Sequence, residues 1–147
     1  MRDVIIPKKK RKSGIPTGNA GEYLVMGELL RRGYDAQLAD RNTQGYDLLV
    51  GRPGDRELRK VQVKTVRRQP WFIRVSDFAQ LPDQPTVYVL LGDESSDAPV
   101  RFFIAVNRDL TGFFHHPEDW KAQDKDSGFM KLKTLEPCEG RWALVLS

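Results

Sequence analysis

The chain has 147 residues, the size of one ordinary domain, and its 39% hydrophobic and 30% charged residues exclude a disordered polypeptide. No apolar stretch approaches the roughly 20 residues that span a bilayer, and the N-terminal segment lacks the apolar region of a secretory signal. The single cysteine excludes an internal disulfide, so we expect a cytoplasmic protein without membrane contact.

Positive charge is concentrated at the N-terminus, where residues 1–12 hold six Lys or Arg and one Asp. Residues 13–74 carry 11 basic and seven acidic groups, whereas residues 75–147 carry seven basic and 12 acidic groups. This pattern predicts a flexible basic arm over residues 1–16, followed by a single domain over residues 17–147. Phosphate-binding surface is expected on the arm and on the first half of the domain.

The cations of the arm are Lys8, Lys9, Lys10, Arg11 and Lys12. Such a run of like charges cannot join a core, and it is a candidate for sequence-independent binding of nucleic-acid phosphates. A solvated tail and a nuclear import signal are the alternatives that the same composition leaves open.

Residues 17–32 are predicted to form the first helix. Asn19 is a favourable N-cap, and Glu22 stands three residues later, where a capping-box acid belongs. Gly33 is typical of the residue that ends a helix in the left-handed conformation. The apolar stripe expected to face the core consists of Leu24, Met26, Leu29 and Leu30.

A series of strands is expected after this helix. Alternating and apolar runs predict strands over residues 34–38, 46–50, 58–66, 71–75, 86–91 and 100–106, with a closing strand over residues 141–146. Ser76 is expected to cap a short helical turn that ends near Pro82. Residues 107–140 give no clear pattern. One helix followed by a meander of strands predicts an α/β fold with a mixed central sheet.

The second and third strands are expected to form an antiparallel hairpin, because Pro53-Gly54-Asp55 between them is typical of a turn. If this turn is centred on its Gly-Asp bond, Asp47 lies directly opposite Gln62. Lys64 is two residues from Gln62 and therefore projects from the same face of its strand. The hairpin thus predicts a cluster of three polar side chains, which a slip of one residue would abolish.

Such a cluster has the chemistry that phosphodiester hydrolysis needs. A hard divalent cation prefers oxygen ligands, which the Asp47 carboxylate, the Gln62 side-chain carbonyl and the Val63 backbone carbonyl supply. Lys64 can orient a water molecule and offset the charge of the phosphate. Glu22 can reach the metal through water if its helix packs beside the hairpin. The alternatives are a plain helix cap for Glu22 and a solvated strand face for Gln62 and Lys64.

The sequence resembles the PD-(D/E)XK nuclease superfamily in three segments: Gly21-Glu22, residues 45–50 (GYDLLV) and residues 61–65 (VQVKT). In that superfamily a helix Glu, a strand Asp and an acid-x-Lys motif on the next strand form the active site. The likeness is greatest to the small bacterial endonuclease group that includes a group I intron homing endonuclease. That group also carries Gln where its relatives carry an acid.

The resemblance implies a restriction-endonuclease-like fold, with a mixed central sheet, flanking helices and a hairpin that carries the active site. It implies a metal-dependent endonuclease that acts on DNA with Mg²⁺, for which Mn²⁺ can substitute, and frequent assembly into dimers or tetramers. Glu22, Asp47, Gln62 and Lys64 match the catalytic positions. The chain departs from the pattern at Tyr46, where the superfamily has Pro, and at Gln62, whose neutral side chain lowers the ligand charge.

Outside the motif, Arg67, Arg68 and Arg74, with Trp71 and Phe72, predict a DNA-facing strip in which cations contact phosphates and a ring stacks on a base. Strand alternation points only one of the two aromatic side chains inward.

Two rival functions stay open. One is a catalytically weakened nuclease-fold module that binds nucleic acid or a protein partner, which the neutral Gln62 favours. The other is a protein that mimics nucleic acid through its acidic second half. His115-His116 has no Cys or acid at zinc-ligand spacing and is interpreted as a surface pair.

Overall fold

The computed structural model describes residues 14–40, 45–116 and 126–146. The predicted phosphate-binding cations Lys8 to Lys12 lie outside the described residues. The elements, in chain order, are α1 (Ile15–Arg31), β1 (Asp35–Leu38), β2 (Leu48–Gly51), β3 (Arg59–Val66), β4 (Trp71–Arg74), α2 (Val75–Gln80), β5 (Pro85–Leu90), β6 (Arg101–Val106), α3 (Asn107–Leu110), β7 (Ser127–Met130), α4 (Leu132–Leu135), and the 3₁₀ helices η1 (Glu136–Cys138) and η2 (Trp142–Leu146).

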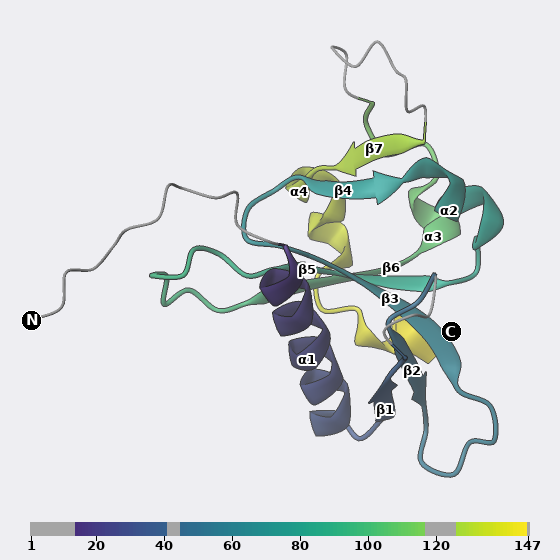
Figure 1. The fold of residues 1–147 in the computed structure, drawn as a ribbon. Helices are drawn as coiled ribbons and strands as arrows, with labels where there is room; N and C mark the ends of the chain where they lie inside the picture. The colour runs from purple at the N-terminus through teal and green to yellow at the C-terminus, as the bar shows by residue number, and fades with distance from the viewer. Residues whose placement is uncertain (1–13, 41–44, 117–125, 147) are drawn as a thin grey trace, which may run out of the picture.

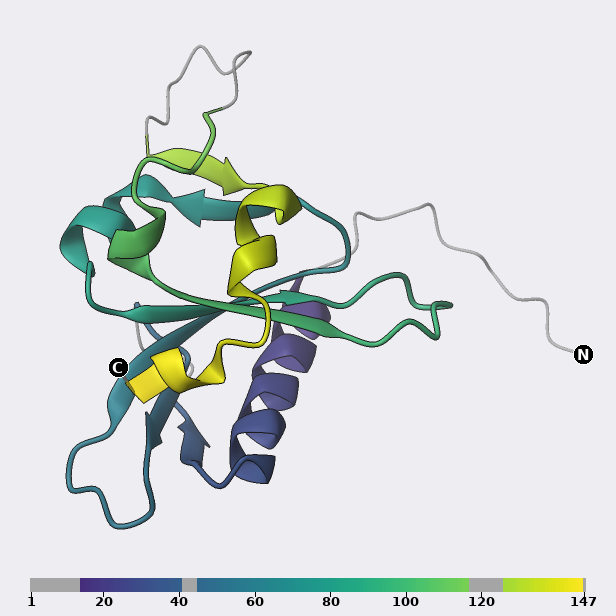
Figure 2. The same ribbon diagram turned by 180° about the vertical axis from the view of Figure 1, so that it is seen from behind.

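Five strands form the central sheet in the order β1-β2-β3-β5-β6. The β3–β5 pair is parallel and the other three pairs are antiparallel, so the predicted mixed sheet is confirmed. Helix α1 lies on one side of the sheet, and the separate β4–β7 pair lies on the other (Figures 1 and 2). Each side has its own hydrophobic core, so the sheet is covered by packed side chains on both faces. Within the described ranges, no helix has the length and apolarity that a membrane crossing requires.

Helix α1 begins earlier than the sequence pattern indicates. Gly14 is its N-cap and Pro16 lies in its first turn, where a missing backbone N–H costs nothing. The predicted N-cap at Asn19 is therefore wrong, and Glu22 projects from the helix body, seven residues after its start, rather than completing a capping box. The predicted end is confirmed: Gly33 has a φ of +89°, and its N–H donates to the carbonyl of Leu30 at 3.0 Å.

The buried face of α1 consists of Gly21, Val25 and Leu29. The predicted stripe was wrong in part, since Leu24 and Leu30 are 39% and 48% exposed. The buried face was mispredicted because it includes Gly21, which does not count as an apolar residue in a sequence pattern. The lack of a side chain at Gly21 lets the helix approach the sheet closely. A Cβ placed on Gly21 would lie 1.7 Å from Thr65 Oγ1 on β3, so this contact admits no side chain on the helix.

The hairpin of β2 and β3 has the predicted register. Leu48 pairs with Val61 and Val50 pairs with Arg59, the same offset that was expected from a turn centred on the Gly-Asp bond. The strand itself is shorter than predicted, because the paired ladder ends at Leu48. Asp47 lies just outside it, and its N–H donates to the carbonyl of Val61 at 2.9 Å.

The C-terminal segment differs from the prediction of a closing strand. Residues 142–146 form the 3₁₀ helix η2, and its two buried side chains, Trp142 and Val145, are three residues apart, as one face of a 3₁₀ helix requires. Trp142 packs against Phe102 of β6, with ring centroids 5.1 Å apart. The apolar residues in 141–146 are compatible with the two-residue period of a strand and with the three-residue period of a 3₁₀ helix. Packing against the sheet stabilises the helix.

The contact between α1 and β3 gives a stability prediction. Gly21→Ala introduces a methyl group where Thr65 already fills the space, so we expect the free energy of unfolding to fall by about 1–3 kcal/mol. Gly27→Ala is the matched control on the same helix, because nothing lies within 4 Å of its added Cβ. The control should raise the free energy of unfolding by roughly 0.5–1 kcal/mol, since alanine favours helix. Urea unfolding measures both free energies. Equal changes for the two variants would contradict the close packing of Gly21 against Thr65.

Candidate active site

Asp47 is held at the point where β2 leaves the sheet. Its N–H donates to Val61 O on β3, and its carbonyl accepts from the N–H of Ala39, which follows β1 (both 2.9 Å). Its side chain turns to β3 as well, where Oδ2 accepts from the N–H of Val63 at 2.8 Å. Three backbone contacts from two neighbouring segments therefore fix both the main chain and the carboxylate of Asp47.

The electrostatic setting of Asp47 combines opposing effects. Burial raises the pKa of this carboxyl above its usual value, while the Val63 N–H and the positive charge of Lys64 act to lower it. Burial prevails, so the ionised carboxylate is less well solvated than it would be in water. A cation bound beside it would favour the ionised form, and this is the setting expected of a metal ligand.

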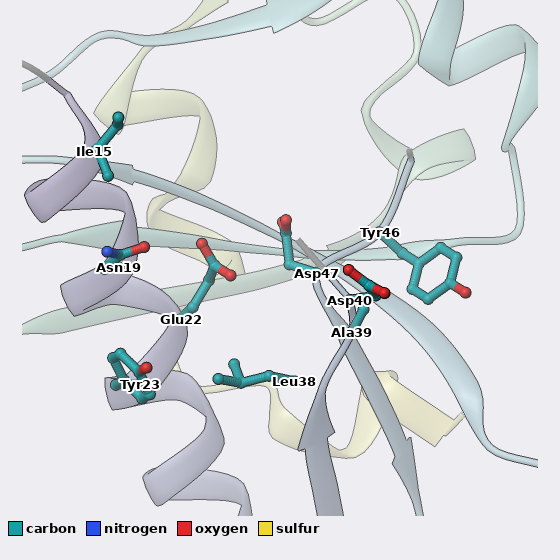
Figure 3. A pocket seen from close by; sticks show the side chains of 9 residues that line it. All are labelled: Ile15, Asn19, Glu22, Tyr23, Leu38, Ala39, Asp40, Tyr46 and Asp47. Atoms are coloured by element: carbon teal, nitrogen blue, oxygen red, sulfur yellow. The ribbon is translucent and has the colours of Figure 1, made fainter. Parts of the chain in front are cut away.

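Glu22 and Asp47 line one cavity of about 340 Å³ between α1 and the β1–β2 side of the sheet. Figure 3 shows Glu22 projecting from α1 toward Asp47 across this cavity. The nine lining residues are Ile15, Asn19, Glu22, Tyr23, Leu38, Ala39, Asp40, Tyr46 and Asp47. Helix α1 therefore packs beside the hairpin, as a role for Glu22 requires.

Asp40 is a third carboxylate of this cavity, and sequence reasoning missed it. It stands two residues after β1, and the register in which Leu38 pairs with Leu48 would, if extended, set it opposite Tyr46. No partner was predicted for the first strand, so no sequence pattern placed Asp40 near Tyr46. Figure 3 shows Asp40 beside Ala39, close to Asp47.

Gln62 and Lys64 lie on the opposite face of β3 from α1. Thr65 packs against Gly21 of α1, so the alternation of the strand directs Gln62 and Lys64 to the side of α2 and β4. There they line a second cavity of about 250 Å³, together with Gly45, Arg74, Asp77, Gln80 and Leu81. The four predicted residues therefore do not share one cavity.

The segment of residues 45–47 connects the two cavities. Gly45 lines the cavity of Gln62 and Lys64, whereas Tyr46 and Asp47 line the cavity of Glu22. The charge of Lys64 acts on the Asp47 carboxylate, so the two predicted residues are electrostatic neighbours although they line different cavities. The hairpin thus brings Asp47 and Lys64 together, and α1 adds Glu22 from the other side.

The donor set fits a hard divalent ion held by few protein ligands. Mg²⁺ is commonly bound by one or two carboxylates, with water and substrate phosphates completing its shell. Asp47 and Glu22 supply two carboxylates to one cavity, and Gln62 carries a neutral oxygen in the neighbouring cavity. In the part of the chain that the structure describes, no group of three His, Cys, Asp or Glu is placed to hold a metal ion by itself. The residues therefore suit Mg²⁺ with a bound phosphate rather than a cage made by the protein alone.

The three arginines of the predicted DNA-facing strip have different neighbours. Arg67 donates to the carbonyl of Gly92 at 3.2 Å, and Arg68 pairs with Asp93 at 2.8 Å. Arg74 lines the cavity of Gln62 and Lys64, and its side chain is 69% exposed. Of the three, Arg74 is the cation that borders a candidate catalytic residue.

The prediction that only one of Trp71 and Phe72 points inward is confirmed. Trp71 is fully buried, and its Nε1–H donates to the carbonyl of Val89 at 3.1 Å. Phe72 is 63% exposed on the outer face of β4. The buried ring anchors the β4–β7 pair to the sheet, and the exposed ring is available to a ligand.

Comparison with known proteins identifies the fold. The sequence matches no protein-family model and no curated protein. Among solved structures, the chain is similar to Hjc, a Holliday junction resolvase from the archaeal hyperthermophile Archaeoglobus fulgidus. The TM-score is 0.51 and the sequence identity is 16%, with 83% of this chain and 88% of that chain covered. The expected restriction-endonuclease-like fold is therefore confirmed, and the narrower likeness to the homing endonuclease group stays a prediction.

The raised pKa of Asp47 gives a testable pH dependence of stability in the absence of metal. Because the folded chain binds this proton more tightly than the unfolded chain, the carboxyl lowers the free energy of unfolding as pH rises through its folded pKa. Asp47→Asn removes the charge and keeps an oxygen to accept from Val63. We expect the variant to be more stable than the wild type at about pH 7, and the difference to shrink toward about pH 4, near the ordinary pKa of Asp. Urea unfolding with EDTA measures this, and a variant that is less stable at both pH values would contradict it.

Proposed function

We propose that the protein is a metal-dependent endonuclease that hydrolyses phosphodiester bonds in DNA. The observation that carries the proposal is the Asp47 carboxylate, which is fixed by the backbone of β3, influenced by Lys64 and placed in one cavity with Glu22. The similarity in fold to a Holliday junction resolvase supports the same class of substrate.

In this proposal Asp47 and Glu22 hold Mg²⁺, with Glu22 acting directly or through water, and the Gln62 side chain and Val63 carbonyl are further oxygen donors. The bound ion would supply a more acidic water molecule and would offset negative charge on the phosphate. Lys64 donates hydrogen bonds from its ammonium group to the attacking water or to a non-bridging phosphate oxygen. Hydrolysis adds water across one P–O bond and yields a phosphate monoester and a hydroxyl.

Cations outside the cavities would hold the DNA. Arg74, the last residue of β4, borders the cavity of Lys64, and Arg67 and Arg68 begin the loop between β3 and β4. The basic arm adds contacts to phosphates in this proposal. These contacts are electrostatic and would give affinity that falls steeply with salt, without sequence preference.

A catalytically weakened module is the second candidate, and one observation favours it. Gln62 stands at the position of an acid and brings no negative charge, and the described residues hold no group of three acidic or other strong metal ligands. Such a protein would bind DNA or a protein partner without cleaving DNA. Metal affinity separates the two candidates.

Cleavage is tested directly with supercoiled plasmid. We expect the wild-type protein to nick it in the presence of Mg²⁺, and Lys64→Ala to lower the rate by about 100-fold or more, since removing one preorganised donor has an effect of this order. Arg56→Ala, in the exposed hairpin turn, is the matched control and should keep the wild-type rate. Wild-type inactivity on duplex, branched and single-stranded DNA would reject the endonuclease.

Metal binding is tested by calorimetry with Mn²⁺ in place of Mg²⁺. We expect Asp47→Asn to abolish the binding, because it removes a ligand charge, and Gln62→Glu to strengthen it, because it adds one. An increase of affinity of about tenfold for Gln62→Glu corresponds to about 1.4 kcal/mol. If the wild type binds no Mn²⁺ but Gln62→Glu does, the weakened module is favoured.

A further inference from the structure

The outer face of the β4–β7 pair carries a row of aromatic side chains. Phe72 of β4 is the cross-strand partner of Phe129 of β7, and His115 forms an antiparallel bridge with Phe129 on the far side. Directly paired residues project from the same face, so the three side chains line up across three neighbouring chain segments. The imidazole of His115 stacks on the Phe129 ring, with centroids 5.4 Å apart and planes inclined by 21°.

Two members of this row are open to solvent, and Phe129 between them is half-buried. Phe72 is 63% exposed, and His115 is exposed as well. The opposite face of the same pair is buried, where Trp71, Ile73 and Met130 pack against the sheet. In both views of the ribbon the β4–β7 pair forms the outermost layer on this side of the molecule (Figures 1 and 2). Apolar residues at every second position of β4 and β7 are explained by the face that packs into the core. Core packing does not explain why the other face of the pair carries an exposed aromatic ring.

Cations flank the row on its two sides. Lys131, two residues after Phe129, places Nζ 6.0 Å from the centroid of that ring. Arg74, two residues after Phe72, lies on the opposite side, where its nearest carboxylate oxygens, of Asp77 and Asp126, are 3.8 and 4.0 Å away. Both basic side chains belong to the same face as the rings. Planar rings between cations complement a strand of unpaired nucleotides, whose bases stack and whose phosphates are negative.

We propose that the row of Phe72, Phe129 and His115, with Lys131 and Arg74, binds unpaired nucleotides of DNA. The existing stack of His115 on Phe129 offers a surface that an unpaired base can continue, whereas the bases of an intact duplex are already stacked on one another. This inference rests on the proposed function and refines it, because the substrate becomes DNA with a single-stranded segment.

The row is continuous with the candidate active site through Arg74. This residue belongs to the outer face of β4 and also lines the cavity of Gln62 and Lys64. A strand that stacks on Phe72 and contacts Arg74 would pass from the aromatic row to the edge of that cavity. The row therefore selects the substrate, and the site beside Lys64 acts on the backbone that the row presents.

The test is the binding of a fluorescent oligothymidylate and of a blunt duplex of equal length, measured by anisotropy in EDTA so that cleavage plays no part. Phe72→Leu keeps apolar bulk but removes the ring, and Phe72→Tyr keeps the ring. We expect Phe72→Leu to weaken binding of the single strand about fivefold or more while duplex affinity stays the same. Phe72→Tyr and the control Leu24→Ala, an exposed apolar residue on α1, should bind both as the wild type does.

The salt dependence gives a second readout. Lys131→Gln should reduce the slope of log affinity against log salt for the single strand by about 0.7, the value expected for one lost phosphate contact. Equal binding of the single strand by the wild type and Phe72→Leu, or equal losses on single strand and duplex, would overturn the inference. If plasmid nicking fails while this pattern holds, the aromatic row stands as a nucleotide-binding site and the endonuclease does not.

Discussion

Helix α1 meets the sheet at Gly21, a residue without a side chain, directly over Thr65 of β3. This contact decides how close the helix lies, and the next residue along the chain is Glu22. A larger residue at position 21 would push the helix away from β3 and carry Glu22 away from Asp47. The distance between the Glu22 and Asp47 carboxylates therefore depends on a packing contact at Gly21, the residue before Glu22. Protein interiors transmit such changes because they are packed as densely as crystals.

Asp47 shows why a site forms where a strand ends. Inside a ladder its backbone groups would pair regularly with β3, and its side chain would be one of an alternating series. Just beyond Leu48, the carboxylate instead accepts from the Val63 N–H. The result is a carboxylate fixed by β3 yet open to a cavity, with a pKa that burial raises. A bound cation would offset that unfavourable solvation. The burial that raises the pKa of Asp47 therefore also favours the binding of a metal ion in the proposed site.

The two sides of the sheet have different tasks in the proposed enzyme. The side of α1 provides Glu22 and a first core, and the side of β4 and β7 provides Lys64, Arg74 and a second core. The second layer is anchored by Trp71, which packs edge-on to Tyr88 and Phe103 with ring centroids about 6 Å away. Because the anchor is buried, the outer face of the β4–β7 pair is free to carry rings and cations for a ligand.

The sequence by itself determined the features that local chemistry controls. A turn centred on a Gly-Asp bond gave the register of β2 and β3, Gly33 ended α1, and alternation placed Trp71 inside and Phe72 outside. Each depends on residues within a few positions, or on a strand period of two. These local rules also gathered Asp47 and Lys64, because the hairpin that joins them is closed by one short turn.

Only the tertiary structure decided which side of the sheet each element covers. The pairing of β4 with β7 joins segments more than 50 residues apart, and no local pattern predicts it. The start of α1 at Ile15, the buried face built around Gly21 and the 3₁₀ form of η2 likewise follow from packing against the sheet. The same holds for Asp40 in the cavity and for the placement of Glu22 and Lys64 on opposite faces of β3. Such features arise from contacts between distant residues, and their free energy is gained only when the whole sheet is formed.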